Sequence, residues 1–536
     1  MLVLWPLRCF HGLAFATIAV MSETVRRENL ESTNFNRITV RAGELENHGM
    51  CTSGTVIISE DGVDRATASI VGYQQAYPPR GQPLTFILQG GPWAPASSNN
   101  TLSFGSEFAL LLDDTDRTAP NGLQRFTLTD HTLFPYISDT LSIDQIDTGL
   151  GHVLPGTDPE WPYDMERSVA INAAIIKWYA NEYGYHDSPL CGVASSFGVN
   201  TLMGVVPQLT DAGLTVPGLI AISGAYDDRF RNHDGATDPM RFLPGLTAMA
   251  LAAQFHGKAN PGCTPYELYD EVEAFALGPY ATALQEDDPT TWLRKKGLLS
   301  QFIGYTGMPS ALVHKHRGRI PFDVFREQLL VDQGKVLSAI DTRIAVPGPT
   351  SVEFDPASDI WRRKTMEEFL AGPYASLLGH VSMLRMADYQ GTIKARPRMR
   401  FAGIWEEQRA HKAMGHLLDR LPGIRIDDYN GFYDGIRPAP GSHIFWTELA
   451  ERRKNRAPLS VSRRVQRDLC NDGRFFDGSS VNTFTLPMGH QLTLPDTCHD
   501  MTRQAMCVFI KRAIRPPRPS FVFDGIRSPG GSSELA

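Results

Sequence analysis

Short apolar runs bounded by glycine or small polar residues recur along this chain, and they have the length of buried strands. They occupy residues 84–89, 189–193, 218–224, 399–404 and 483–488. Longer stretches with other periodicities separate them. This alternation predicts an α/β protein, with a mostly parallel central sheet flanked by helices.

The segment 166–181 has the spacing of an amphipathic helix. Its apolar residues recur at i, i+3, i+4 and i+7 as Ile171, Ala174, Ile175 and Trp178. At 3.6 residues per turn these positions share one face. We therefore predict a helix that packs this face on the sheet.

The chain divides into a core and an insertion. Residues 228–395 are helical in pattern and are predicted to form a large, mainly helical cap. The core is predicted in two parts, residues 35–227 and 396–514. Residues 1–34 form a separate N-terminal segment, and the tail 515–536, rich in Pro, Gly and Ser, is expected to be unfolded.

Ser196 is the first candidate for chemistry. It lies between the strand-like run 189–193 and a helix-like run, residues 200–209, in the order small-x-Ser-x-Gly with Ala194 and Gly198. This pattern is typical of a nucleophile elbow, where a helix N-terminus supports negative charge. The motif also arises by chance, so a serine in an ordinary loop is an equal alternative until partners are found.

Partners follow in the order that an α/β-hydrolase uses, which is Ser, acid, His. Asp434 stands in the turn-rich stretch 430–435, and His490 ends the strand-like run that begins at residue 483. The histidine would accept the serine proton and return it to the leaving group. The aspartate would hold the imidazole in the required tautomer.

Two glycines follow the predicted strand at residues 84–88. Gly90 and Gly91 carry no side chain, so their backbone N–H groups can approach a reacting oxygen closely. We predict that the N–H groups of Gly91 and Phe197 form an oxyanion hole.

Together these motifs resemble the serine carboxypeptidase family, specifically its bacterial branch, within the α/β-hydrolase superfamily. The family's N-G-G-P-G-x-S-S, D-x-x-G-T-G-x-S, G-E-S-Y-G-G, G-x-x-D-x-x-x-P and G-H-M motifs correspond to residues 89–96, 144–151, 194–199, 431–438 and 489–491. The resemblance extends from about residue 35 to residue 515, with each motif degraded. It implies the α/β-hydrolase fold and a serine hydrolase that cleaves a peptide or amide bond through an acyl-enzyme on Ser196.

The expected substrate-binding residues are Gln89, Gly90, Trp93 and Ser195, and three of them depart from the family. The resemblance implies that Asn and Glu hold the substrate's carboxylate where this chain has Gln89 and Ser195. Trp93 replaces a glycine and would narrow the pocket. Loss of polar partners weakens selectivity for a free carboxylate. An esterase or acyltransferase that has lost this clamp is therefore an alternative, and a non-catalytic binder is another.

Composition excludes other classes. The chain of 536 residues is 42% hydrophobic, enough for a sizeable core, and its net charge of −8 gives no general attraction to nucleic acid. The basic residues between Arg452 and Arg467 are interpreted as a solvated helical face. The seven cysteines form no C-x-x-C pair, and no metal, phosphate-loop, dinucleotide or haem motif is present. We expect no cofactor and no metal.

The N-terminus leaves the cellular location open. Residues 1–20 are mostly apolar, but Arg8 interrupts them, which disfavours a transmembrane helix. A start at Met21 favours the cytoplasm. If residues 1–20 act as a signal peptide, a periplasmic or secreted protein follows. The expected partner is a small peptide or acyl substrate, and the oligomeric state is open, with a homodimer among the alternatives.

Overall fold

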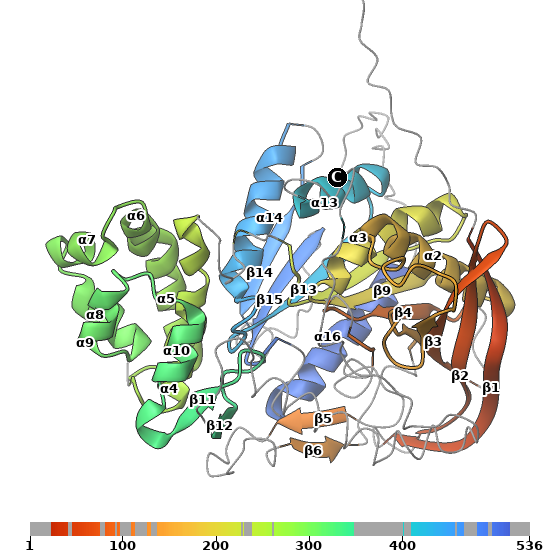
Figure 1. Ribbon diagram of the computed structural model, residues 1–536, viewed down its shortest axis with the longest axis horizontal. Helices are drawn as coiled ribbons and strands as arrows, with labels where there is room; N and C mark the ends of the chain where they lie inside the picture. The colour runs from red at the N-terminus through yellow and green to blue at the C-terminus, as the bar shows by residue number, and fades with distance from the viewer. Residues whose placement is uncertain are drawn as a thin grey trace, which may run out of the picture.

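Figure 1 shows the computed structural model, in which a central sheet carries helices on both faces and a group of helices lies at one end. The structure describes residues 23–40, 45–75, 81–91, 94–96, 109–112, 126–129, 137–226, 229, 238–259, 262–347, 400, 409–455, 458–465, 480–490 and 496–514.

The described strands form an 11-stranded sheet in the order β1-β2-β3-β7-β4-β9-β10-β13-β15-β14, with β8 (His152–Val153) paired to β3. The first three strands pair antiparallel and are long; they are β1 (Glu23–Val40), β2 (Leu45–Glu60) and β3 (Val63–Gln75). The sheet thus begins ahead of the core boundary that we predicted at residue 35.

The remaining strands of this sheet pair parallel, beyond one antiparallel step from β3 to β7. They are β7 (Asp139–Ile143), β4 (Leu84–Leu88), β9 (Leu190–Ser195), β10 (Gly218–Ile222), β13 (Arg425–Gly431), β15 (Val481–Leu486) and β14 (Val461–Val465). The strand order departs from chain order at two places, where β7 lies between β3 and β4 and where β15 lies between β13 and β14. This is the α/β-hydrolase fold, as predicted. A separate pair consists of β5 (Ala109–Leu112) and β6 (Phe126–Thr129).

Helices cover both faces of the sheet. One face packs on α2 (Met165–Glu182), α3 (Gly198–Asp211), α13 (Arg409–Arg420) and α14 (Ala439–Arg453), and the other on α16 (Asp496–Ile514). Successive strand residues alternate between the two layers: Phe86 joins the α2 side and Ile87 the α16 side. Because both faces are covered, β4, β9 and β10 are largely apolar, which explains their continuous hydrophobic runs.

Helix α2 is confirmed, but its buried face is rotated from the prediction. Ile171 and Ile175 are buried as expected, whereas Ala174 and Trp178 are only half-buried. Asn172 and Tyr179 occupy the buried face instead. Asn172 donates its side-chain amide to the Ser168 carbonyl at 2.7 Å, so a polar residue is satisfied within the core and escapes a purely apolar pattern.

The described part of the insertion is mostly helical and has its own apolar core. Its helices are η5 (Pro239–Phe242), α4 (Gly245–Phe255), α5 (Pro265–Phe275), η6 (Ala276–Tyr280), α6 (Ala281–Leu284), α7 (Pro289–Lys295), α8 (Leu299–Thr306), α9 (Ser310–Lys315), α10 (Phe322–Gln328) and η7 (Val331–Gln333). Phe432 and Tyr433, which follow β13, join this core. The cap therefore packs directly on the loop that precedes Asp434.

A small antiparallel hairpin follows the cap helices, formed by β11 (Lys335–Leu337) and β12 (Ala345–Pro347). The helical pattern did not predict it. The rest of the predicted cap, residues 348–395, lies outside the described residues. So do the tail 515–536 and, apart from Arg400, the strand-like run 399–404. Arg400 forms an isolated parallel bridge with Asp164.

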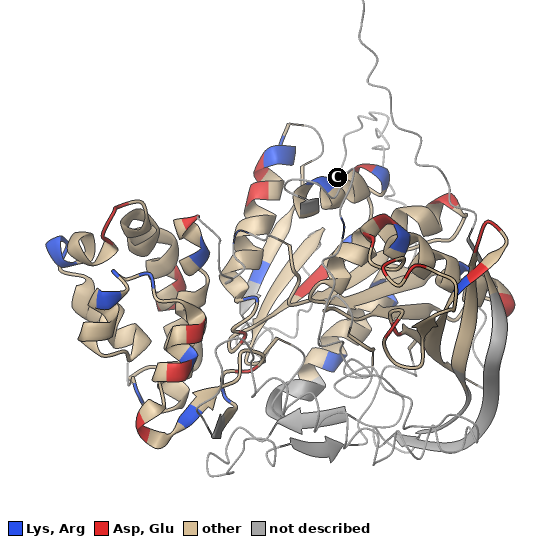
Figure 2. Cartoon of the chain, viewed as in Figure 1, with Lys and Arg blue, Asp and Glu red and all other residues tan. Residues whose placement is uncertain are grey.

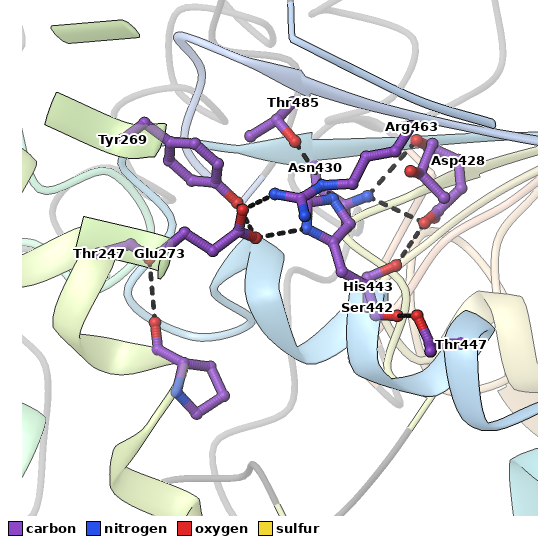
Figure 3. A network of polar contacts seen from close by, with 12 residues as sticks. Thr247, Tyr269, Glu273, Asp428, Asn430, Ser442, His443, Thr447, Arg463 and Thr485 are labelled. Carbon is purple, nitrogen blue, oxygen red and sulfur yellow. Dashed lines mark hydrogen bonds and ion pairs between the residues drawn. The ribbon is translucent and has the colours of Figure 1, made fainter. Parts of the chain in front are cut away.

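A polar network with a buried centre at Glu273 and His443 joins the cap to the core (Figure 3). Glu273 of α5 lies 2.7 Å from Nδ1 of His443 on α14, and it accepts a hydrogen bond from Tyr269 at 3.0 Å. Arg463 of β14 pairs with the same carboxylate. Thr485 Oγ1 lies 3.3 Å from the other ring nitrogen of His443. The network ties one cap helix to three elements of the core.

Charged side chains lie mainly on helices and turns, and the central strands carry few (Figure 2). The predicted solvated face of basic residues is not a single surface. Arg452, Arg453 and Lys454 end α14, whereas Arg463 belongs to β14. Arg453 is buried and pairs with Asp419 at 2.7 Å. Tertiary pairing, which sequence spacing does not reveal, divides this cluster.

Candidate active site

Ser196 occupies a sharp turn between β9 and α3. Its φ is 51°, in the left-handed region, which costs a non-glycine residue on the order of 1 kcal/mol. Backbone hydrogen bonds hold the turn: Ser196 N donates to Ile222 O at 2.8 Å, and Ala225 N donates to Ser196 O at 3.1 Å. A Cβ at Gly198 would lie 2.8 Å from the Gln89 carbonyl oxygen. The glycine of the motif is therefore required by the close passage of β4.

The three residues expected to act together do meet. His490 Nε2 lies 2.8 Å from Ser196 Oγ, and His490 Nδ1 lies 2.9 Å from Asp434 Oδ2. Asp434 and His490 are buried, while Ser196 is partly open. The imidazole can therefore take a proton from the hydroxyl while the carboxylate holds its other nitrogen.

The loop after β13 fixes the Asp434 carboxylate. Its Oδ1 accepts hydrogen bonds from the backbone N–H groups of Ile436 at 2.8 Å and Arg437 at 2.7 Å. This leaves Oδ2 directed at His490. Tyr433 N donates to Met488 O at 3.0 Å, which joins the acid loop to the loop after β15. Backbone contacts thus set both the orientation of the acid and its distance from the histidine.

The two glycines after β4 lie against the nucleophile turn. A Cβ at Gly90 would lie 2.6 Å from Ser196 Cβ and 3.1 Å from Phe197 N. Gly91 has a φ of 119°, a conformation open to glycine. The structure therefore brings the predicted oxyanion-hole segments together beside Ser196. Trp93, predicted to line the pocket, lies outside the described residues.

Gln89 and Ser195, which the sequence resemblance aligned with a carboxylate clamp, are bonded to each other. Ser195 Oγ donates to Gln89 Oε1 at 2.9 Å, and both side chains are buried. The Gln89 backbone carbonyl accepts from Gln145 Nε2 at 2.9 Å. The pair is neutral, so it satisfies buried polar atoms without placing a titrating carboxyl beside the nucleophile.

Sequence reasoning missed the contribution of the β11–β12 hairpin. His490 N donates to Ile340 O at 2.5 Å. A Cβ at Gly489 would lie 2.5 Å from the same oxygen and 2.7 Å from Asp341 Cβ. The glycine before His490 is thus required by the approach of a cap segment. Nothing in the local pattern around residue 340 signals this contact.

No protein-family model and no curated protein matches this chain. Among solved structures it is similar to a prohormone-processing carboxypeptidase from Saccharomyces cerevisiae, with 12% identity, 90% of this chain and 91% of that chain covered, and a TM-score of 0.49. It is also similar to a thermostable carboxyl esterase from Bacillus coagulans, with 10% identity, coverage of 91% and 100%, and a TM-score of 0.32.

A further similar structure is a proline iminopeptidase-related protein from Thermus thermophilus, with 13% identity, coverage of 86% and 98%, and a TM-score of 0.31. Within the described part of the chain, no helix combines the length and apolar character needed to cross a bilayer. The α/β-hydrolase assignment rests on the strand order and on the helices that cover the sheet.

Proposed function

We propose that this protein is a serine hydrolase that works through an acyl-enzyme on Ser196. The observation that carries the proposal is the chain of contacts Ser196 Oγ–His490–Asp434, at 2.8 and 2.9 Å. An unactivated serine is a weak nucleophile, and an adjacent oriented base is what makes it reactive. Three polar side chains aligned in this way have no evident packing role.

In the proposed reaction, Ser196 Oγ attacks a carbonyl carbon and His490 Nε2 takes the hydroxyl proton. His490 then gives this proton to the leaving group as the bond to it breaks, which leaves an ester on Ser196. Water attacks the ester, again with His490 as base, and the acid product leaves. The Asp434 carboxylate stabilises the imidazolium that forms in each half of the reaction.

The tetrahedral intermediate carries negative charge on oxygen. We assign its stabilisation to the backbone N–H groups of Gly91 and Phe197. The support is the contact of the Gly90 segment with Ser196 and Phe197. The start of α3 at Gly198 adds the positive end of a helix dipole directly after the nucleophile.

For the substrate we favour a peptide or amide bond, as the resemblance to serine carboxypeptidases implies. A second candidate is an ester, or acyl transfer to another hydroxyl or amine. The Gln89–Ser195 hydrogen bond favours this second candidate, because it occupies the Ser195 hydroxyl, which could otherwise donate to a substrate carboxylate. A site without a free carboxylate clamp has little means to require a free C-terminus.

The first experiment is labelling with a fluorophosphonate probe, with wild type compared to Ser196→Ala and the modified peptide mapped by mass spectrometry. The proposal expects labelling at Ser196 that the mutant loses. Absence of labelling in folded wild type would contradict it. Turnover of a blocked dipeptide free acid, its amide and an acyl ester then separates the two substrate classes. Preference for the free acid supports a carboxypeptidase, and indifference to it supports the second candidate.

A further inference from the structure

The tip of the β11–β12 hairpin, residues 338–344, is buried although it is a connecting loop. Ser338 N donates to Ile344 O at 2.8 Å and closes the tip, and all of its residues except Ala339 are buried. Loops ordinarily lie at the surface, because buried backbone groups need partners. The partners of this tip therefore indicate what it does.

Three backbone hydrogen bonds join the tip to the two loops that carry Asp434 and His490. They run from Gly435 N to Ala339 O (3.0 Å), from Thr342 N to Tyr433 O (3.0 Å) and from His490 N to Ile340 O (2.5 Å). The tip thus lies between the acid loop and the histidine loop and bonds to both.

Asp341 and Arg343 form a fully buried ion pair inside this tip. Arg343 Nε donates to Asp341 Oδ1 at 2.9 Å, and Nη2 donates to Oδ2 at 2.6 Å. The remaining guanidinium nitrogen, Nη1, donates to the Pro487 carbonyl at 3.0 Å. The guanidinium carbon also lies 4.7 Å from the centre of the Tyr433 ring. The planar guanidinium makes these contacts at once, which a lysine ammonium does not.

We propose that the Asp341–Arg343 pair is a positioning device that holds His490 in reach of Ser196, an inference that rests on the proposed function. The segment 487–490 is anchored at both ends on the hairpin tip, by Arg343 at Pro487 and by Ile340 O at His490. Neither charged residue is bonded to Ser196 or to the His490 ring in the contacts described. They act through the backbone that carries the imidazole.

Removal of one partner alone would leave an uncompensated buried charge and cost folding, which would obscure a positioning role. Replacement of both with apolar residues of similar size avoids this cost. The informative variant is therefore Asp341→Leu/Arg343→Met, which removes the contact with Pro487 and keeps the site filled. Arg343→Lys is the conservative variant, since it retains the charge but not the planar fork that reaches the Asp341 carboxylate and the Pro487 carbonyl together.

A matched control is available elsewhere in the core. Arg453 is also a buried arginine that bonds a carboxylate, Asp419 at 2.7 Å, and a backbone carbonyl, Gly415 O at 3.1 Å. It joins α14 to α13, and these contacts involve neither catalytic loop. Arg453→Lys therefore reports the general effect of this substitution on stability.

The experiment measures three quantities in each full-length variant: the fluorophosphonate labelling rate at Ser196, the thermal midpoint, and the downfield proton NMR resonance of the His490–Asp434 hydrogen bond. We expect the double variant to keep its thermal midpoint, lose the resonance and label about 100-fold more slowly, because a displacement near 1 Å suffices for such a loss. Arg343→Lys should fall between the double variant and wild type, and Arg453→Lys should label as wild type.

Labelling of the folded double variant within about 2-fold of wild type, with the resonance retained, would overturn the positioning role. If the double variant does not fold, the labelling rates and resonances of Arg343→Lys and Arg453→Lys are compared instead. Slower labelling and a lost resonance in Arg343→Lys alone support the positioning role, and wild-type behaviour of Arg343→Lys overturns it. If wild type itself does not label, the proposed function fails. The NMR resonance then still tests the positioning role. Loss of the resonance only in the Arg343 variants supports that role, and persistence of the resonance in those variants overturns it.

Discussion

The imidazole of His490 and the hydroxyl of Ser196 are 294 residues apart along the chain, and their Nε2 and Oγ atoms lie 2.8 Å apart. The two residues follow β15 and β9, which are separated in the sheet by β10 and β13. Parallel strands bring their carboxyl ends to one edge of the sheet, so side chains distant in sequence converge there.

Loss of Ser196 or His490 should remove turnover. We expect Ser196→Ala and His490→Ala each to lower kcat by about 10⁶-fold, because the nucleophile and base act as a unit. Asp434→Asn should cost less, about 10⁴-fold, since it disturbs only the imidazole tautomer. Steady-state kinetics on the preferred substrate, with thermal midpoints as the control for folding, checks this. Near-normal turnover by folded Ser196→Ala would exclude the acyl-enzyme mechanism.

The left-handed backbone at Ser196 should lower the stability of the protein when any residue other than glycine occupies this position. Alanine would keep the left-handed φ of 51°, whereas glycine adopts it freely. We expect the free energy of unfolding of Ser196→Gly to exceed that of Ser196→Ala by about 1 kcal/mol, so the glycine variant is the more stable of two inactive proteins. Urea denaturation of the two variants measures the difference. A Ser196→Ala variant at least as stable as Ser196→Gly would contradict stored strain at this turn.

The glycine beside the nucleophile should not tolerate a methyl group. A Cβ at Gly90 would lie 2.6 Å from Ser196 Cβ and 2.8 Å from the Ser195 carbonyl oxygen. We expect Gly90→Ala to cost about 1–3 kcal/mol of stability and to lose most of its fluorophosphonate labelling. Gly415→Ala on α13 is the control, because nothing lies within 4 Å of its Cβ position. Wild-type labelling by Gly90→Ala would show that the glycine turn does not border the nucleophile.

The pH dependence of turnover should reflect one base, the neutral imidazole of His490. A protonated His490 cannot accept the serine proton, so turnover should fall in acid. The Gln89–Ser195 pair adds no carboxyl group that would favour acid conditions. We therefore expect kcat/KM to fall on acidification and to show no second limb from a carboxyl group of this pair. A profile that peaks between about pH 4 and 5 would imply an essential carboxyl group in the site.

Stability should fall in acid because of His443. Burial lowers the pKa of His443 to about 4, from an ordinary value of 6.5. The Asp428 carboxylate opposes this shift but does not outweigh burial. Between these values the unfolded chain binds the proton and the folded chain does not. The contribution of neutral His443 to the free energy of unfolding is therefore present above pH 6.5 and is lost as pH falls towards 4.

The free energy of unfolding is expected to lose about 2 kcal/mol through His443 between roughly pH 7 and 4.5. Other buried groups act in the opposite direction; burial raises the pKa of Asp139 to about 6, so its protonation in acid favours the folded state. The measurement is therefore a difference, urea denaturation of wild type against His443→Gln at each pH. If the free energy of unfolding changes with pH by the same amount in both proteins, His443 does not make this contribution.

The local features of this fold could be predicted from the sequence. The strands β4, β9, β10 and β15 appear as short apolar runs because both faces of the sheet are covered. The small residues around Ser196 mark a turn through which β4 passes closely. Hydrophobic period and turn chemistry are local properties, so a single chain displays them. The order of Ser196, Asp434 and His490 further indicated one site, through the resemblance to a family that uses this order.

Contacts that depend on register and packing were decided by the tertiary structure alone. The α2 face turned so that Asn172 and Tyr179 are buried. The basic cluster was divided by ion pairs with Asp419 and Glu273. Most aspartates and arginines are exposed, so nothing in the sequence marks Asp341 and Arg343 as a buried pair. Only the folded chain brings this hairpin tip against the loops of Asp434 and His490, because long-range pairing is selected by the packing of the whole core and not by the residues adjacent in sequence.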